Sequence, residues 1–286
     1  MSYKSADDWR KSRHKRVLLL GMSGLGKTHV SNMLRAQGDW FHYSVDYRIG
    51  TRYMGELIAD NAKHEAMKVP FLREMLMSDS IYIASNITFE NLAPLSAYLG
   101  KPGDPELGGL SIDEYRRRQD QHRAAEISAL LDTPHFMDRA QAIYGYDHFV
   151  CDTGGSICEV VDPSNKNDEV LNTLSNDLLI VWIEGSDAHA AELARRFDLA
   201  PKPMYYQPEF LEAAWAEYLN NNKVSEGDVN PDDFVRWTYS RALAHRAPLY
   251  REIAQWGVAV QAHDIAQVKS AGAFEALIAS TLEMRG

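Results

Sequence analysis

The chain has 286 residues, of which 45% are hydrophobic and 24% charged, an ordinary balance for a soluble globular protein. These values exclude a disordered chain and leave room for one large domain or two small ones. The net charge of −10 disfavours polynucleotides and anionic membranes as partners. The two cysteines, Cys151 and Cys158, are too few for a disulfide framework, and no stretch resembles a signal peptide or a membrane span. We therefore expect a cytoplasmic location.

Short apolar segments alternate with helical ones along the chain. Residues 16–21 (RVLLLG) are aliphatic and end in glycine, as in a strand buried on both faces of a parallel sheet. Residues 28–36 have the apolar spacing of a helix. Further strands are expected at residues 40–45, 148–151, 178–183 and 257–261. Further helices are expected at residues 112–131, 187–197, 208–220, 231–244 and 271–284. This alternation predicts an α/β fold with a mainly parallel sheet and ligand chemistry at the carboxyl ends of its strands.

The pattern is weaker between residues 53 and 110. Within that stretch, residues 101–109 (KPGDPELGG) are dense in turn-forming residues. We interpret residues 53–110 as a helical insertion on the core of a single domain that spans residues 1–286.

A glycine-rich motif joins the first expected strand to the first expected helix. Residues 21–28 (GMSGLGKT) match G-x-x-x-x-G-K-[ST] at every required position. A loop that wraps phosphate oxygens with backbone N–H groups needs glycine at several positions, and the N-terminus of a helix adds a favourable potential for anions. The motif therefore predicts a binding site for the phosphates of a nucleotide.

The residues of this loop have distinct expected roles. Lys27 is expected to bridge the β- and γ-phosphates in catalysis, and the Thr28 hydroxyl to ligate Mg²⁺. The residues predicted to bind the nucleotide are Gly21, Ser23, Gly24, Leu25, Gly26, Lys27, Thr28 and His29.

Five patches beyond the loop resemble one group of P-loop proteins. They are residues 41–46 with Arg48, residues 113–125, the turn Thr153-Gly154-Gly155, residues 194–204, and residues 245–254 (HRAPLYREIA). In this order, and together with the loop, they resemble the shikimate-kinase-type small-molecule kinases. The resemblance implies a three-layer P-loop NTPase fold with a lid at about residues 194–222.

The resemblance also implies roles for residues outside the loop. Arg116 and Arg246 match arginines that bind the acceptor, and a guanidinium suits a carboxylate or phosphate group. Arg246 is further expected to act in catalysis. Gly154 and Gly155 match a glycine-rich turn at the acceptor site, and Arg195 lies where a lid or adenine-stacking arginine belongs.

The chain departs from the family at several of these positions. Ser44 replaces an acidic residue, Ser156 a third glycine, and Lys202 a lid arginine. The resemblance therefore implies phosphoryl transfer to a hydroxyl, and not shikimate as the acceptor.

Two carboxylates that follow expected strands complete the predicted site. Asp46 is predicted to bind the acceptor hydroxyl and to accept or orient its proton, with a turn or helix cap as the alternative. Asp152 is placed like a Walker B carboxylate that holds Mg²⁺ through water, with a cap before the glycine turn as its alternative. Thr28 and Asp152 are thus the expected metal-binding residues.

These observations predict a kinase that uses ATP and Mg²⁺. The expected acceptor is a hydroxyl of a small, anionic or polyhydroxylated metabolite. An ATP-binding ATPase that regulates a protein partner through residues 53–110 is the alternative, and a nucleoside or polynucleotide kinase is a third possibility. The sequence leaves the acceptor's identity and the oligomeric state open.

Overall fold

The chain divides into two compact units. The computed structural model describes residue 3 and residues 5–285. The first unit holds the described residues up to Val45, together with Ile127–Pro201 and the residues from Arg236 onward, and the second unit holds Asp46–Glu126 and Lys202–Val235. Each unit is described by itself below.

The first unit is built on a five-stranded sheet. Its strands are β1 (Arg16–Leu20), β2 (Trp40–Ser44), β3 (His148–Asp152), β4 (Leu179–Glu184) and β5 (Val258–Gln261). They lie in the order β2-β3-β1-β4-β5, and each pairing of neighbours is parallel. The α/β class with a parallel sheet is confirmed, and the predicted strand bounds differ from these by at most one residue at either end.

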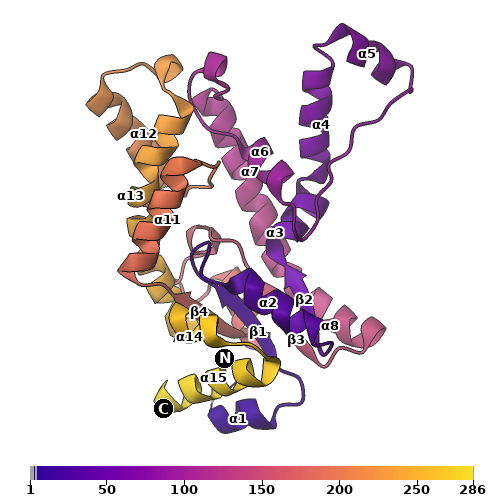
Figure 1. Cartoon of the computed structure of the whole chain (residues 1–286), viewed down its shortest axis with the longest axis vertical. Helices are drawn as coiled ribbons and strands as arrows, with labels where there is room; N and C mark the ends of the chain where they lie inside the picture. The colour runs from indigo at the N-terminus through magenta and orange to yellow at the C-terminus, as the bar shows by residue number, and fades with distance from the viewer. Residues whose placement is uncertain (1–2, 4, 286) are drawn as a thin grey trace. The chain divides into compact units, whose positions relative to one another are not determined.

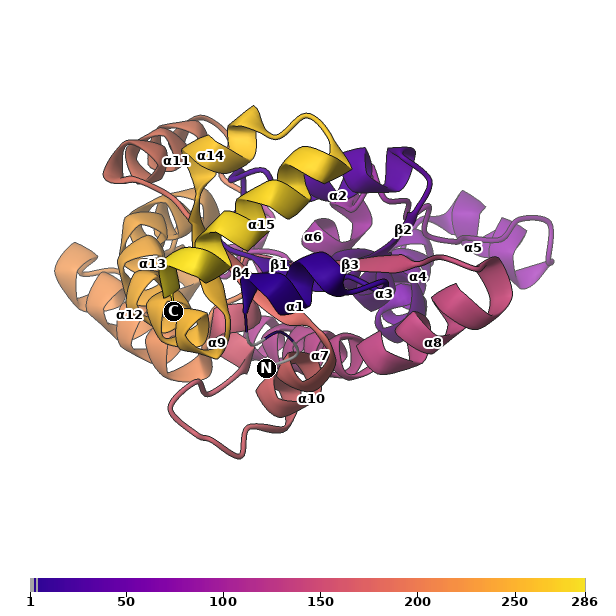
Figure 2. The same cartoon turned by 90° about the horizontal axis from the view of Figure 1, so that it is seen from below.

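One face of the sheet carries a continuous apolar core. The helices that contribute to it are α1 (Ala6–Lys11), α2 (Lys27–Ala36), α14 (Ala262–Gln267) and α15 (Ala271–Arg285). Their apolar side chains pack on alternate strand residues, such as Val17, Val150 and Val181. Figure 2 shows α1 beside α15, where the fully buried Trp9 donates a hydrogen bond of 2.9 Å from Nε1 to the carbonyl of Glu275.

The opposite face of the sheet is covered by other helices of the same unit. They include α8 (Thr133–Tyr144) and α10 (Glu169–Asp177), while α9 (Ile157–Val160) follows β3 and α11 (Asp187–Leu199) follows β4. The ring of Phe136 in α8 lies 4.9 Å from that of Tyr43 in β2, on the side of β2 away from Trp40. The first unit therefore has three layers, with the sheet between two layers of helices (Figure 2).

Helix α13 (Pro231–Ile253) is longer than the predicted helix at 231–244. Pro248 lies inside it, although proline removes a backbone hydrogen bond and usually ends a helix. The side chains of Arg246, Tyr250 and Ile253, on both sides of Pro248, are buried in the first unit. Their burial stabilises the helical turns that the local sequence signal disfavours.

The second unit is helical. Its α-helices include α4 (Gly55–Ala66), α5 (Pro70–Met77), α6 (Ala93–Leu99) and α12 (Pro208–Asn222), which Figure 1 labels. It also contains the π-helical turn Ile49–Tyr53 and the 3₁₀ turns Pro105–Leu107 and Glu226–Asp228. Three helices contribute residues to both units: α3 (Val45–Arg48), α7 (Ile112–Leu131) and α13. The remaining 3₁₀ turn, Ala254–Trp256, belongs to the first unit.

Residues 53–110 contain α4, α5 and α6, while residues 194–222 contain the end of α11 and the whole of α12. That the first stretch is an insertion on a single domain, and that the second acts as a lid, stay predictions. Among the described residues, no helix is long and apolar enough to cross a membrane.

Candidate nucleotide-binding site

The glycine-rich loop connects the buried end of β1 to the start of α2. Gly21, the first loop residue, has a φ of +146°, and a Cβ added there would lie 2.7 Å from the carbonyl oxygen of Ile183 in β4. Gly26, the last, has a φ of +97° and serves as the N-cap of α2. Both positions require glycine, because side chains disfavour these backbone conformations and β4 leaves no space at Gly21. The backbone conformation of the loop therefore explains why the motif has glycine at its first and last loop positions.

The N-terminus of α2 has the properties of an anion site. No side chain caps it, and no acidic residue lies in its first turn. The first N–H groups of such a helix lack intrahelical partners, and its dipole favours negative charge. Lys27 is buried at this point, and its Nζ donates hydrogen bonds to the carbonyls of Gly21 at 2.7 Å and Met22 at 3.0 Å. The ammonium group is thereby held on the inner side of the loop.

Asp152 ends β3, the strand beside β1. It is 6% exposed, and its Oδ2 lies 3.7 Å from Nε2 of His42 in β2. Its Oδ1 is buried and accepts no hydrogen bond from the described residues. The next residue, Thr153, donates from its amide at 3.2 Å and from its hydroxyl at 3.0 Å to the carbonyl of Leu19, which fixes the end of β3 against β1. The predicted Walker B position is therefore rigid and buried.

The predicted glycine turn lies against the phosphate loop. A Cβ added to Gly155 would lie 3.5 Å from the backbone N of Ser23. The hydroxyl of Tyr250 donates a 2.7 Å hydrogen bond to the carbonyl of Gly155, and Gly154 is buried. Burial raises the pKa of the Tyr250 phenol well above its ordinary value, so this group keeps its proton as a donor.

Arg246 lies one turn before Tyr250 on α13 and is also buried. Its Nη2 donates to Oε2 of Glu159, whose side chain is fully buried in α9. Burial by itself lowers the pKa of the guanidinium, but Glu159, Cys158 and Tyr250 together raise it by more, and the pKa lies above its usual range. The structure thus brings Gly154, Gly155 and Arg246 close to the loop, with the charge of Arg246 compensated by Glu159. The predicted roles of these residues in catalysis and acceptor binding stay predictions.

A pocket of about 290 Å³ lies next to the loop in the first unit. Its lining residues are Gly24, Leu25, Gly26, His29, His189, Ala262, Ile265 and Ala266. The lining combines aliphatic groups with two imidazoles, which suits the flat, partly apolar ring of a nucleotide base. Four of these residues, His189 and those of α14, were not among the predicted ones. They lie in α11 and α14, the helices that follow β4 and β5, so the rule that ligands bind at carboxyl ends of parallel strands would have found them.

Arg195 does not line this pocket. It is exposed on α11, where its Nε donates a 2.8 Å hydrogen bond to Glu192. Hydrogen bonds from Arg195 and Arg196 lower the pKa of Glu192 to about 2, so the carboxylate is ionised at neutral pH. The expected contact of Arg195 with the nucleotide stays a prediction.

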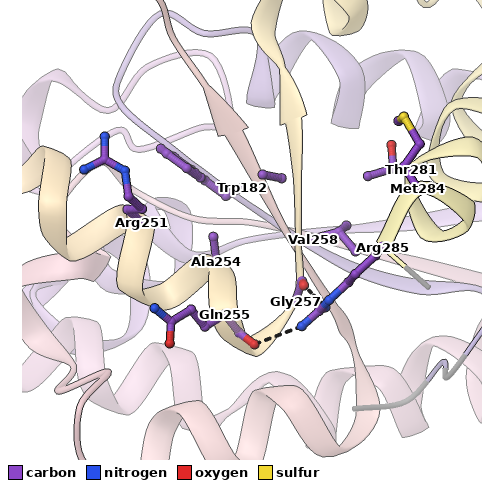
Figure 3. A pocket seen from close by; sticks show the side chains of 10 residues that line it. Trp182, Arg251, Ala254, Gln255, Gly257, Val258, Thr281, Met284 and Arg285 are labelled. Atoms are coloured by element: carbon purple, nitrogen blue, oxygen red, sulfur yellow. Dashed lines mark hydrogen bonds between the residues drawn. The ribbon is translucent and has the colours of Figure 1, made fainter.

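A larger pocket, of about 530 Å³, lies at the other end of the sheet. It surrounds the start of the edge strand β5 and includes Trp182 and Arg251. Arg285 donates there to the carbonyls of Gly257 and Gln255, and these bonds cover the start of the strand (Figure 3). Because ligands of parallel α/β sheets bind at the carboxyl ends of the strands, the smaller pocket beside the loop is the better candidate for the nucleotide.

Two of the predicted site residues belong to the second unit. Asp46 lies in the short helix α3, two residues after β2 ends, and is partly exposed. Arg116 lies in α7, where its guanidinium donates to Glu212 at 2.7 and 2.8 Å and to Asp113 at 2.9 Å. The roles of both residues toward an acceptor stay predictions.

Comparison with known proteins adds little to this geometry. No protein-family model matches the chain, and no match is found among curated proteins. A shikimate kinase from Bacteroides thetaiotaomicron, solved as a crystal structure, aligns over 95% of this chain and 96% of its own. The identity is 15% and the TM-score 0.37, a similarity too low to support an argument about family or function.

Proposed function

We propose that the chain is an ATP-dependent phosphotransferase that transfers the γ-phosphate to a hydroxyl of a small, anionic or polyhydroxylated metabolite. The observation that carries this proposal is the glycine loop between β1 and α2, with its uncapped helix N-terminus and the buried ammonium group of Lys27. Phosphoryl transfer needs positioned phosphates and a positive charge that stabilises the transferred group. The loop would position the phosphates, and Lys27 would supply the positive charge.

The nucleotide would lie along the loop and into the neighbouring pocket. The phosphates would take hydrogen bonds from the N–H groups at the start of α2, and Lys27 would exchange its two carbonyl partners for phosphate oxygens. The base would lie between the aliphatic side chains of α14 and the imidazoles of His29 and His189. Residues 165–168 (NKND) match the Asn-Lys-x-Asp pattern that reads guanine in switch GTPases. None of them lines this pocket, and Asp168 caps α10, so ATP is the nucleotide of this proposal.

Thr28 and Asp152 fit a magnesium ion. Mg²⁺ prefers oxygen ligands and is usually held by a hydroxyl, a carboxylate, waters and phosphates. The Thr28 side chain is exposed at the start of α2, and Oδ1 of Asp152 is a buried carboxylate oxygen with no hydrogen bond from the described residues. The ion, when bound, neutralises charge on the phosphate oxygens. Asp152 would hold it through water.

On the acceptor side, Asp46 would orient the attacking hydroxyl and accept its proton. Gly154 and Gly155 would allow the acceptor to approach the phosphate loop, because they carry no side chains. Arg116 and Arg246 would bind an anionic group of the acceptor, provided that each guanidinium leaves or shares its present carboxylate.

The proposal is tested by incubating the protein with Mg²⁺, ATP carrying a labelled γ-phosphate, and a metabolite extract. Mass spectrometry should find a newly phosphorylated metabolite, and the Lys27→Ala variant should not produce it. Asp46→Ala should lower kcat by about 10²–10⁴, the usual contribution of general acid–base catalysis, without weakening ATP binding. Unchanged turnover in that variant would remove Asp46 from the proposed role.

One observation favours the alternative of an ATPase that acts through a protein partner. Helix α5 has no buried residue, and Phe71, Met77 and Tyr82 in and after it are 66%, 74% and 87% exposed. Large apolar side chains exposed to this degree often mark contact surfaces when they form a patch. Steady ATP hydrolysis that no metabolite stimulates, with no phosphorylated product in the extract, would support this alternative.

A further inference from the structure

An imidazole is buried beside the metal-type carboxylate of β3. The side chain of His42 in β2 is 0% exposed, and that of Asp152 is 7% exposed. Burying a polar side chain lowers stability unless its polar atoms are compensated, and aliphatic residues are usual at such strand positions. A histidine here therefore calls for a reason beyond packing.

The register of the sheet brings the two side chains together. β2 and β3 are parallel, and His42 pairs with Val150 while Ser44 pairs with Asp152. Side chains two residues apart on a strand share a face, so His42 lies on the same face as Asp152, one step back from the end of the sheet. Trp40 and Val150 on that face pack in the core with Val30 of α2, the helix that begins at the phosphate loop. The pair is thus enclosed between the sheet and α2.

The two oxygens of the Asp152 carboxylate differ in their surroundings. Oδ2 faces Nε2 of His42 at 3.7 Å, whereas Oδ1 is buried and takes no hydrogen bond from the described residues. The separation of 3.7 Å is longer than a hydrogen bond, but contacts of this kind often shorten when a ligand binds. An imidazole on one oxygen restrains the rotation of the carboxylate and leaves the other oxygen in a defined direction.

We propose that His42 is a positioning residue for Asp152: its Nε2–H orients the carboxylate so that Oδ1 can serve the cation of the bound nucleotide. This inference rests on the proposed function, because it takes the ligand to be a divalent cation on a triphosphate. His42 acts through Asp152 and does not touch the nucleotide. Hydrogen-bond partners of metal-binding side chains typically change metal affinity by 10–100-fold when they are removed.

The test measures binding and not catalysis. The affinity for ATP is determined by calorimetry with Mg²⁺ and with EDTA, and the ratio of the two values gives the gain due to the cation. His42→Leu should reduce that gain about tenfold and leave the affinity in EDTA unchanged. Asp152→Asn should cause a similar loss, and the double variant should lose no more than Asp152→Asn alone, since both changes act on one contact.

Two further variants serve as a rescue and a control. His42→Gln should recover part of the gain, because its side-chain amide can also donate to the carboxylate, and it replaces His42→Leu if that variant does not fold. His148→Leu changes a histidine at the opposite end of β3, beside Lys15, and should leave the gain unchanged.

Each outcome decides between explanations. A full cation-dependent gain in His42→Leu, or equal losses in His42→Gln and His42→Leu, would show that the histidine is only part of the core. Additive losses in the double variant would also overturn the inference. Binding of ATP with no transfer to any metabolite would contradict the proposed kinase activity and leave this inference standing, whereas an unsubstituted protein that binds no ATP would overturn both.

Discussion

Charged side chains are held in different ways in the two compact units. In the first unit, Arg246 and Glu159 form an ion pair whose side chains are 8% and 0% exposed. In the second unit, Arg116 and Glu212 form an ion pair at 37% and 53% exposure. Water can replace a lost partner in the exposed pair but not in the buried one. Charge in the first unit therefore fixes local geometry, whereas this pair in the second unit lies at a solvated helix surface.

This difference in burial matters because Arg246 and Arg116 were predicted to have the same role. Both were expected to bind an anionic acceptor. The buried Arg246 lies one turn from Tyr250, which holds the carbonyl of Gly155 beside the phosphate loop. Arg116 can exchange its carboxylate partners for a ligand at little expense in stability, and Arg246 cannot.

The largest effect is expected at Lys27, a buried charge of the first unit. Lys27→Ala removes the ammonium group that would stabilise the transferred phosphate, and turnover should fall by about 10³-fold or more. Lys68→Ala, an exposed lysine of the second unit paired with Glu65, is the matched control and should leave turnover unchanged. Both are measured as initial rates of ATP consumption. Similar rates in the two variants would remove the distinction between the units.

The next largest effect is expected at the buried pair. Arg246→Ala leaves Glu159 buried without its partner and should lower the free energy of unfolding by about 3–5 kcal/mol. Denaturant titration followed by tryptophan fluorescence measures the change. The double variant Arg246→Met with Glu159→Leu should recover much of the loss, because it leaves no buried charge. A loss below about 1 kcal/mol in Arg246→Ala would mean that water reaches this pair.

A smaller effect, with a defined pH dependence, is expected at Glu114 of the second unit. Hydrogen bonds from Arg117 and, against the opposing effect of burial, from Arg118 lower the pKa of Glu114 from 4.5 to about 2. A lowered folded-state pKa stabilises the protein above pH 4.5, and that stability is lost as the pH falls toward 2.

Glu114→Gln should therefore destabilise the protein by about 1 kcal/mol at pH 7 and by nearly nothing at pH 2. Thermal unfolding across this pH range gives the comparison. A difference that stays constant with pH would show that the two arginines do not act on the charge of Glu114.

The smallest effect on stability is expected at Arg116. Arg116→Ala removes an ion pair that is more than a third exposed and should change the free energy of unfolding by less than about 1 kcal/mol. If Arg116 binds the acceptor, the same variant should raise the KM for the acceptor while the KM for ATP stays the same. Arg117→Ala, on the next position of α7, is the control for charge alone.

Much of the first unit could be predicted because its signals are local. The strand β1, the glycine loop and α2 follow each other in the sequence, and each is encoded by its own residues. Residues 53–110 of the second unit were harder to predict, because α5 buries no residue and residues 101–109 are dense in turn-forming residues. The helices predicted at residues 112–131 and 208–220 are confirmed by the structure as α7 and α12.

The sequence by itself determined the parallel α/β sheet and the phosphate loop, since alternating apolar segments and obligatory glycines leave few other solutions. Tertiary structure alone decided that Arg246 faces Glu159 and that His42 faces Asp152. It also decided that α13 continues past Pro248. The physical reason is that burial and partner choice depend on segments far apart in the chain, and no local pattern records which side chains will share an interior from which water is excluded.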